Sequence, residues 1–251
     1  MRQRELILLP LAATLLLAGA WQLAVMATGA TIFPSPGDVA RGLGELAGRG
    51  ILWPYIGDSL VRVVSGYLAA AIIGIPFGMA LGWFPMLERI VNPIIQLLRP
   101  ISPLAWMPLA VIWFGVSNAA PIFLIFLAAF FPIVVASMNA VHNIPPMYLQ
   151  AGRNFGLSTP RLMAKVIVPA TFPPILVSLR IAFGIDWLVL VAAEMIAVDS
   201  GLGYLIIDSR NAGKRYDLVV GGMLLIGLVG LMIDALFRWG TRTLMRREVT
   251  E

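Results

Sequence analysis

Long apolar runs alternate with short polar segments along the whole chain. A run of about 20 apolar residues can cross the hydrocarbon core of a bilayer as a helix. The pattern therefore predicts an all-α membrane protein with six transmembrane helices in one domain, residues 1–251. Their approximate bounds are residues 6–28, 59–84, 88–115, 119–141, 166–198 and 218–239.

The first run follows two basic residues, Arg2 and Arg4, as the apolar core of a signal peptide would. It is longer than a typical signal core of about 7–15 residues, so a retained helix is favoured over a cleaved one. Between the first two runs, residues 38–52 have the pattern of a short amphipathic helix lying on the membrane surface.

Small residues recur every four positions in the second run. This spacing places them on one face of a helix, where a neighbouring helix backbone can approach closely. Glycine scattered by chance in an apolar run is the alternative, and five consecutive matches make it weaker. The stripe consists of Gly66, Ala70, Gly74, Gly78 and Gly82.

The third run contains four prolines, which cannot all lie in one straight helix. Each interior proline frees a backbone carbonyl that protein or cavity water must satisfy inside a bilayer. We therefore expect this segment to line a transport route. The prolines are Pro93, Pro100, Pro103 and Pro108.

The fifth run carries Arg180, Asp186 and Glu194, and Arg99 lies in the third. Charged groups are costly at the bilayer centre, so these side chains should face protein or water. Arg180 and Asp186 are six positions apart and do not share a helical face, which argues against a salt bridge between them. Two interpretations of Arg99 and Arg180 stay open: attraction of an anion, or pairing with Glu194, Asp186 or freed carbonyls.

A polar stretch at residues 145–165 separates the fourth and fifth runs. Two prolines at its start suit the first turn of a new helix, so a short helix is expected over residues 147–152. Gly156 can take a left-handed backbone and end it. Thr159 is then expected to cap a second short helix that runs to Lys165. An ordinary loop with two prolines is the alternative.

Composition excludes several classes of protein. Apolar residues make up 59% of the chain, charged residues only 12%, and the mean hydropathy is +0.89, which no soluble domain would show. Without cysteine there is no disulfide or thiolate metal site, and His142 alone cannot build a metal site. No phosphate-binding loop and no hydrolase motif is present, so energy must come from a partner and a membrane enzyme is disfavoured.

The net charge of +5 is explained by membrane orientation rather than by nucleic acid binding, because the basic residues are scattered. If the first helix starts inside, both termini and the 145–165 stretch are cytoplasmic. The ten basic residues on that side are Arg2, Arg4, Arg89, Arg153, Arg161, Lys165, Arg238, Arg242, Arg246 and Arg247, against five outside, Arg41, Arg49, Arg210, Lys214 and Arg215.

The spacing in the polar stretch resembles the EAA loop of ABC importer permeases: Glu-Ala-Ala, three residues, Gly, nine residues, Ile-x-Leu-Pro. Here residues 150–152 (QAG) are followed by Gly156 and then by residues 166–169 (VIVP). Gln and Gly replace the motif's Glu and second Ala. In that family the loop forms coupling helices seated on a separate ATPase. The residues implied in this contact are Met147, Tyr148, Gln150, Ala151, Gly152, Gly156, Leu157 and Arg161.

Two further runs resemble the nitrate, taurine, sulfonate and bicarbonate branch of these permeases. Residues 98–106 (LRPISPLAW) match its LRPxxPLAW signature, and Trp187 with residues 192–195 (AAEM) and 201–203 (GLG) match a second run. The resemblance suggests a small anion as substrate. Packing is the more favoured role for the two tryptophans. The candidate path residues are Arg99, Ser102, Trp106, Arg180, Trp187 and Glu194.

The resemblance implies the six-helix type I importer fold in a bacterial inner membrane. It also implies a second permease copy, expected to be identical to the first, cytoplasmic ATPase subunits that hold ATP and Mg, and a periplasmic solute-binding protein. The chain itself would bind no cofactor and catalyse nothing, and transport would proceed by alternating access. The alternative is a secondary transporter or channel that needs no ATPase. Such a protein would have no use for the coupling helices expected in residues 145–165.

Overall fold

A computed structural model describes residues 3–28 and 33–248, and within them the secondary structure is helical without a β-strand. Arg2, counted above as cytoplasmic, lies outside these ranges. The helices are α1 (Gln3–Thr28), α2 (Pro36–Gly48), α3 (Leu52–Trp83), α4 (Pro85–Leu98), a 3₁₀ turn (Pro103–Trp106), α5 (Met107–Phe114), α6 (Ala119–His142), α7 (Pro146–Asn154), α8 (Thr159–Leu162), a π-helical turn (Met163–Ile167), α9 (Val168–Ala197), α10 (Leu202–Ala212) and α11 (Tyr216–Glu248).

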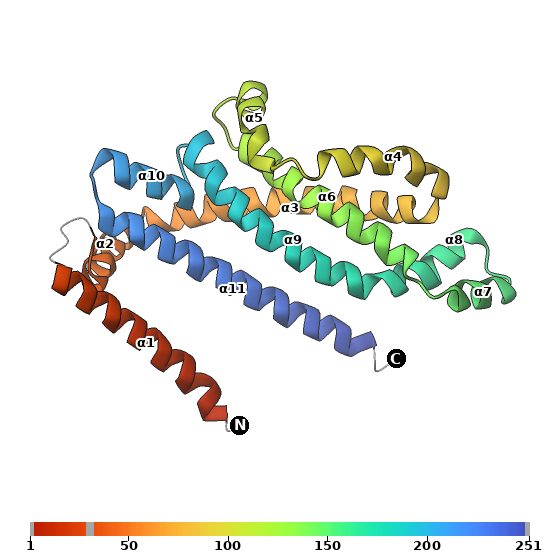
Figure 1. Ribbon diagram of the computed structural model, residues 1–251, viewed down its shortest axis with the longest axis horizontal. Helices are drawn as coiled ribbons and strands as arrows, with labels where there is room; N and C mark the ends of the chain where they lie inside the picture. The colour runs from red at the N-terminus through yellow and green to blue at the C-terminus, as the bar shows by residue number, and fades with distance from the viewer. Residues whose placement is uncertain (1–2, 29–32, 249–251) are drawn as a thin grey trace.

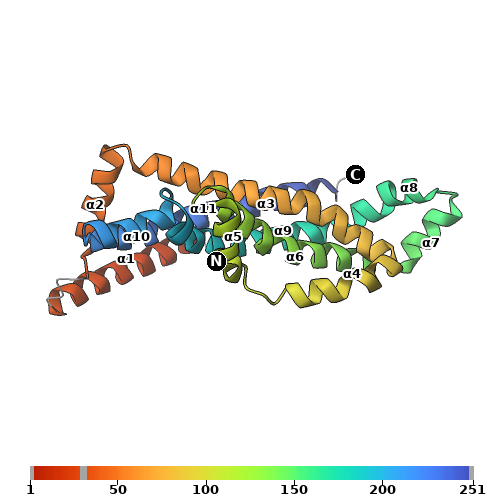
Figure 2. The ribbon, with the colours of Figure 1, turned by 90° about the horizontal axis from the view of Figure 1, so that it is seen from above.

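The long helices α3, α6, α9 and α11 run together along the longest axis of the molecule (Figure 1). Helices α2 and α10 lie at one end, and α7 with α8 projects from the other, as the perpendicular view also shows (Figure 2). In Figure 1, α1 stands apart from this bundle and joins it through α2. The two ends of the bundle therefore differ in construction.

Four helices are long and apolar enough to cross a membrane, and a bent pair supplies a fifth candidate. In α1 the apolar segment found is the shorter Ala12–Ala27. The predicted fold class, an all-helical membrane protein, is confirmed, whereas the exact bounds of six spans stay a prediction. The four candidates are Leu52–Trp83, Ala119–His142, Thr159–Ala197 and Tyr216–Gly240.

The amphipathic segment after α1 forms a helix, α2, whose first turn is capped by Ser35 and Asp38. The Ser35 hydroxyl accepts from the Asp38 backbone N–H, while the Asp38 carboxylate accepts from the Ser35 hydroxyl and backbone N–H. These bonds to Ser35 lower the pKa of Asp38. Gly50, at φ 72°, follows α2, and α3 begins at Leu52, earlier than the predicted span at 59.

The stripe of small residues in α3 faces α6. A Cβ at Gly66 would lie 2.7 Å from the Ile122 carbonyl oxygen, and one at Gly82 would lie 2.7 Å from the Met138 carbonyl oxygen. At Gly78 a Cβ would collide with the Val134 carbonyl. Helix α6 can lie this close to α3 because Gly66, Gly78 and Gly82 have no side chain at the contact. Close packing of the two helices then holds them together.

The third apolar run is broken, as its prolines predicted. Helix α4 meets the segment Pro103–Phe114 at an angle of 84°. The break spans Arg99, which caps the C-terminus of α4, and the 3₁₀ turn that begins at Pro103. Proline cannot donate to a helical ladder, so the chain changes direction here rather than continuing one straight helix.

The polar stretch forms two short helices, as expected. Gly156 has φ 73° and separates α7 from α8, and its N–H donates to the Arg153 carbonyl at 2.9 Å. The predicted cap at Thr159 is wrong by one residue, because Ser158 has the extended backbone of an N-cap and Thr159 is already helical. The second helix does not stop near Lys165 but continues through the π-helical turn into α9.

We predict that Gly78→Ala destabilises the bundle. The added methyl meets the Val134 carbonyl and forces α3 and α6 apart, and such overpacking typically costs about 1–3 kcal/mol. Thermal unfolding of the detergent-solubilised protein measures the effect. Gly57→Ala, in the same helix with open space around the new methyl, is the control and should leave the Tm unchanged or slightly raised. Equal melting of the two variants would refute this role of the stripe.

Candidate functional site

The projecting end of the molecule exposes large apolar side chains on α7 and in the turn after it. Phe155 is 86% exposed and Met147 66%. Beside them, α7 and the start of α9 enclose a hollow of about 690 Å³. Its lining includes Tyr148, Ala151, Gly152, Phe155, Leu157, Lys165, Val166, Pro169 and Ala170. Apolar surface of this kind, on a segment the sequence places outside the bilayer, is characteristic of a protein-binding site.

Short-range contacts fix the shape of this end. Gly152 is buried against α8, and a Cβ there would lie 2.5 Å from a methyl of Leu162. The Leu157 N–H donates to the Gly152 carbonyl at 3.1 Å and closes the turn. Gly152, which departs from the EAA pattern, thus allows α7 to pack on α8. The side chains of Gln150 and Arg161 are exposed, and neither makes a hydrogen bond or ion pair among the described residues.

A cavity of about 280 Å³ lies at the break between α4 and α5. Leu127 and Phe131 reach it from the middle of α6, and Ile185 from the middle of α9, so it lies near half-depth of the bundle. Its lining consists of Arg99, Ile101, Pro103, Trp106, Leu127, Ala128, Phe131, Pro132 and Ile185. The structure thus brings together two of the sequence-predicted path residues, Arg99 and Trp106. Ser102 is exposed in the same break.

Arg99 is exposed at this cavity, and its side chain has no hydrogen bond or ion pair within the described part of the chain. Two other arginines inside apolar spans, Arg62 and Arg180, are paired. Arg180 donates from Nε to Asp234 of α11 at 2.7 Å, so its partner is not the nearby Asp186. Arg62 is paired with Glu194. Of these three side chains, Arg99 alone has no ion-pair partner among the described residues.

Trp187 and Glu194 do not line the cavity. The Trp187 ring is buried, donates from Nε1 to the Ile226 carbonyl at 3.2 Å, and packs where Gly230 leaves room on α11. Glu194 belongs to a polar cluster near the α2 and α10 end. Packing, the more favoured of the two roles considered for the tryptophans, is what the structure shows for Trp187.

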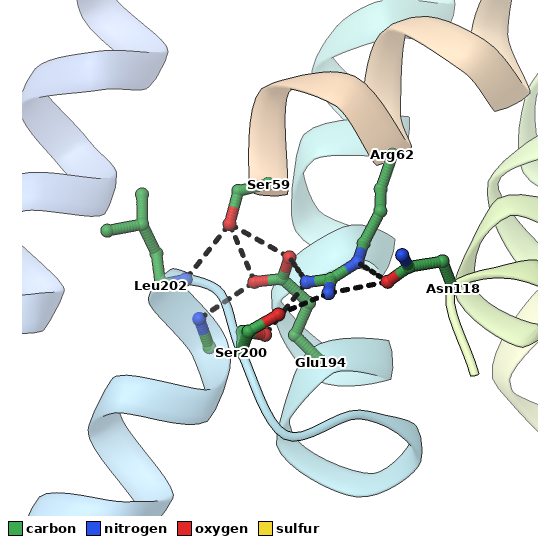
Figure 3. Close-up of polar contacts among 7 residues, drawn as sticks. Ser59, Arg62, Asn118, Glu194, Ser200 and Leu202 are labelled. Carbon is green, nitrogen blue, oxygen red and sulfur yellow. Dashed lines mark hydrogen bonds and ion pairs between the residues drawn. The ribbon is translucent and has the colours of Figure 1, made fainter. Parts of the chain in front are cut away.

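That polar cluster is centred on an ion pair that sequence reasoning missed. Arg62 is 2% exposed and Glu194 is fully buried, and Nη1 lies 2.7 Å from Oε1 (Figure 3). The Ser59 hydroxyl lies 2.8 Å from both carboxylate oxygens, and the Gly203 N–H donates to Oε2 at 2.9 Å. Both charges are therefore balanced by several donors and acceptors, as buried charges require.

The remaining Arg62 donors tie two further segments to this pair (Figure 3). Nε and Nη2 donate to the Asn118 side-chain oxygen at 2.8 and 2.7 Å, and Nη groups donate to Ser200 through its carbonyl and hydroxyl. The cluster thereby connects α3, α6, α9 and the turn before α10. A sequence signal existed: Arg62 precedes Gly66 by four residues and continues the register of the small-residue stripe.

Asp186 is different, because it is fully buried and both carboxylate oxygens lack a hydrogen-bond partner among the described residues. It is also absent from the cavity lining, although its neighbour Ile185 is there. None of the residues that line the cavity is therefore acidic.

Comparison with known proteins decides the family. The model of the family described as binding-protein-dependent transport system inner membrane component matches residues 70–248. The chain belongs to this family. The resemblance found in the sequence is confirmed, and so is the branch, since relatives include taurine, nitrate and bicarbonate permeases.

Three relatives cover most of this permease. The taurine transport system permease protein of Escherichia coli is 35% identical over 90% of this chain and 83% of its own. The nitrate import permease protein of Leptolyngbya laminosa is 40% identical over 75% and 67%. The bicarbonate transport system permease protein of Synechococcus elongatus is 37% identical over 79% and 71%. These relatives are transport permeases rather than enzymes.

A solved structure supports the fold of the permease. An inward-facing form of the MetNI methionine ABC transporter matches with a TM-score of 0.68, covering 77% of this chain and 95% of that one. At 18% identity the match bears on the fold alone. It agrees with the predicted type I importer fold.

We predict that Arg62→Met lowers the Tm strongly, because it leaves the Glu194 carboxylate buried without its cation. Breaking a buried pair from one side typically costs about 3–5 kcal/mol. The double variant Arg62→Met, Glu194→Gln should recover part of that loss in thermal unfolding. Arg41→Gln, which removes an exposed pair with Asp38, is the control and should change little. Strictly additive losses in the double variant would contradict this coupling.

Proposed function

We propose that this permease imports a small anion through the membrane as one subunit of an ATP-driven transporter. The observation that carries the anion assignment is Arg99: a cation near half-depth of the bundle, beside a cavity at a broken span, without a partner in the described chain. A cation beside low-dielectric side chains attracts an anion more strongly than it would in bulk water. The taurine, nitrate and bicarbonate relatives support the same class of solute.

The projecting α7–α8 end supports the ATPase partnership. It offers exposed apolar side chains and a hollow on a short, rigid helical pair, which suits insertion into a groove of a cytoplasmic ATPase. ATP and Mg would be bound by that partner, and this chain would bind no cofactor. ATP binding would move the α7–α8 end, and the bundle would alternate between inward-open and outward-open states.

The complete transporter would contain a second permease copy, most simply an identical one, and a periplasmic solute-binding protein. Its place is the inner membrane of a bacterium, with both termini in the cytoplasm. The bundle supports this orientation, since the C-terminal end of α11 points toward the α7–α8 end (Figures 1 and 2). The basic residues of the sequence favour the same side. No observation favours a channel or secondary carrier.

The partnership is tested by co-purification. A tagged permease should retain an ATPase subunit, and Phe155→Ser should weaken that complex by tenfold or more, because exposed aromatic anchors typically contribute about 2 kcal/mol or more to an interface. Val116→Ser, an exposed apolar residue in the turn between α5 and α6, is the control and should retain the ATPase. Full retention by Phe155→Ser and by a further Met147→Ser variant would count against this docking site.

The anion route is tested by uptake into vesicles that contain the whole complex. Arg99→Gln should reduce anion uptake by about tenfold or more, since a charge-assisted hydrogen bond is typically worth about 1.5–3 kcal/mol, and should leave the Tm unchanged because no partner is lost. Arg180→Gln should show the opposite pattern, a lower Tm through loss of the Asp234 pair. Undiminished uptake by Arg99→Gln would remove Arg99 from the route.

A further inference from the structure

Helix α4 carries its polar side chains on one face. They recur at intervals of three or four residues, which brings them to the same side of a helix. From the first turn to the C-terminal cap they are Glu88, Asn92, Gln96 and Arg99, with Arg89 beside them. Gln96 donates from Nε2 to Asn92 Oδ1 at 3.4 Å, so these two amides are in contact. A continuous polar face therefore runs along α4 and ends at Arg99.

The rest of the α4 surface is apolar and has two parts. One part packs on the bundle, where Ile95 is buried with Leu81 of α3 and Val134 of α6. Leu87 and Val91 lie partly buried against the same cluster. The other part is exposed along the whole helix and consists of Met86, Ile90, Ile94 and Leu97, each more than half exposed. Such an exposed apolar face suits lipid hydrocarbon, so the polar face must meet something else.

The polar face leads from the α7–α8 end of the molecule to the cavity at the break. Trp83, the last residue of α3, and Leu149 of α7 pack against the same buried residues, so α4 begins at that end. In Figure 1 α4 then runs along the bundle toward its middle. Arg89 and Arg99 are ten positions apart, which is about 15 Å along a helix. This length is roughly half of the hydrocarbon thickness of a bilayer.

A hollow of about 590 Å³ lies on this face, and it is lined by Pro85, Glu88, Arg89, Asn92, Pro93 and Gln96. Gln96 is one turn from Arg99, which lines the cavity at the break. Amide and charged groups at this depth need water or an ion, because hydrocarbon cannot satisfy their hydrogen bonds. The hollow and the cavity thus follow one another along the same face of α4.

The chemistry of this face suits an anion. The groups between its two arginines are the neutral amides of Asn92 and Gln96, which donate N–H groups to an oxyanion. Successive donors are about 4.5–6 Å apart along the helix, so an ion can reach the next before it leaves the last. The only carboxylate of α4, Glu88, lies 3.3 Å from Nε2 of His142 on α6. The Arg89 side chain has no hydrogen bond or ion pair among the described residues.

We propose that the polar face of α4 is the inward half of the anion route, along which the solute passes from Arg99 over Gln96 and Asn92 to Arg89. This inference rests on the proposed function, because it takes Arg99 to be on the route and the α7–α8 end to be cytoplasmic. It adds the residues that carry the anion from half-depth to the cytoplasm.

Single cysteines can test this face, because the chain has no cysteine of its own. The permease–ATPase complex in inside-out vesicles is treated with two membrane-impermeant methanethiosulfonates, one bearing a sulfonate and the other a trimethylammonium group. Mass spectrometry of the permease follows each reaction. Gln96→Cys and Asn92→Cys should react with both reagents. After division by the ratio for 2-mercaptoethanol, the anionic reagent should be at least threefold faster, because a positive charge about 6 Å away attracts it even through water.

Matched controls separate the polar face from the lipid-facing one. Leu97→Cys lies next to Gln96 at the same depth but on the exposed apolar face. It should react at least tenfold more slowly with either reagent, because hydrocarbon excludes charged reagents.

A second pair of variants tests the charge at the inner end. Arg99→Gln in the Gln96→Cys permease should lower the preference for the anionic reagent at least twofold, because one of the two flanking charges is lost. Arg41→Gln removes an exposed charge on α2, at the other end of the bundle, and should leave the preference unchanged.

The two proposals fail in different ways. If Gln96→Cys and Asn92→Cys react as slowly as Leu97→Cys, or without preference for the anionic reagent, this inference is overturned and the route at Arg99 stands. The inference is also overturned if Arg99→Gln leaves the preference unchanged, because the face then does not continue from Arg99. Undiminished anion uptake by Arg99→Gln overturns the proposed route itself. Fast reaction with an anion preference that depends on Arg99 supports the inference.

Discussion

Inside a bilayer, every backbone carbonyl that loses its helical partner must be satisfied by protein or by enclosed water, and this constraint governs the third apolar run. Its prolines break the run at an angle of 84°, and the break borders a cavity that side chains from the middle of α6 and α9 also line. The cavity exists because the break cannot fill this space as a continuous helix would. The position of Arg99, at the C-terminal cap of α4, follows from the same break.

Two features keep the surrounding frame rigid enough for such a break. The small residues of α3 bring it against the α6 backbone over several turns, and the Arg62–Glu194 cluster ties the same helices to α9 at one end. The first is a packing effect, spread over many weak contacts, and the second is concentrated in a few buried hydrogen bonds. The small residues and Arg62 lie on one face of α3, so α3 holds α6 and α9, the two helices that line the cavity at the break.

The sequence alone could predict features that depend on local spacing. The stripe from Gly66 to Gly82 follows from small residues at a four-residue interval. The turn at Gly156 and the broken third run follow from the local effects of glycine and proline on the backbone. Pairing of charges could not be predicted, because it depends on which helices meet. Arg180 meets Asp234 from a helix 54 residues later, and Glu194 meets Arg62 from one 132 residues earlier. The predicted helix cap at Thr159 was wrong by one residue, because Ser158 is the N-cap.

Helix α9 connects all of these features in one element. Together with α8 and the π-helical turn, α9 forms one helical segment from Thr159 to Ala197. This segment begins in the projecting α7–α8 end, passes the cavity at Ile185 and carries Glu194 into the polar cluster. A helix resists bending except at specific sites, and this segment has two of them, the π-helical turn and the Pro173–Pro174 pair. Unless the segment bends at one of these sites, a displacement of its first turns also moves the cavity wall. The buried Arg62–Glu194 pair holds the other end of this segment against α3.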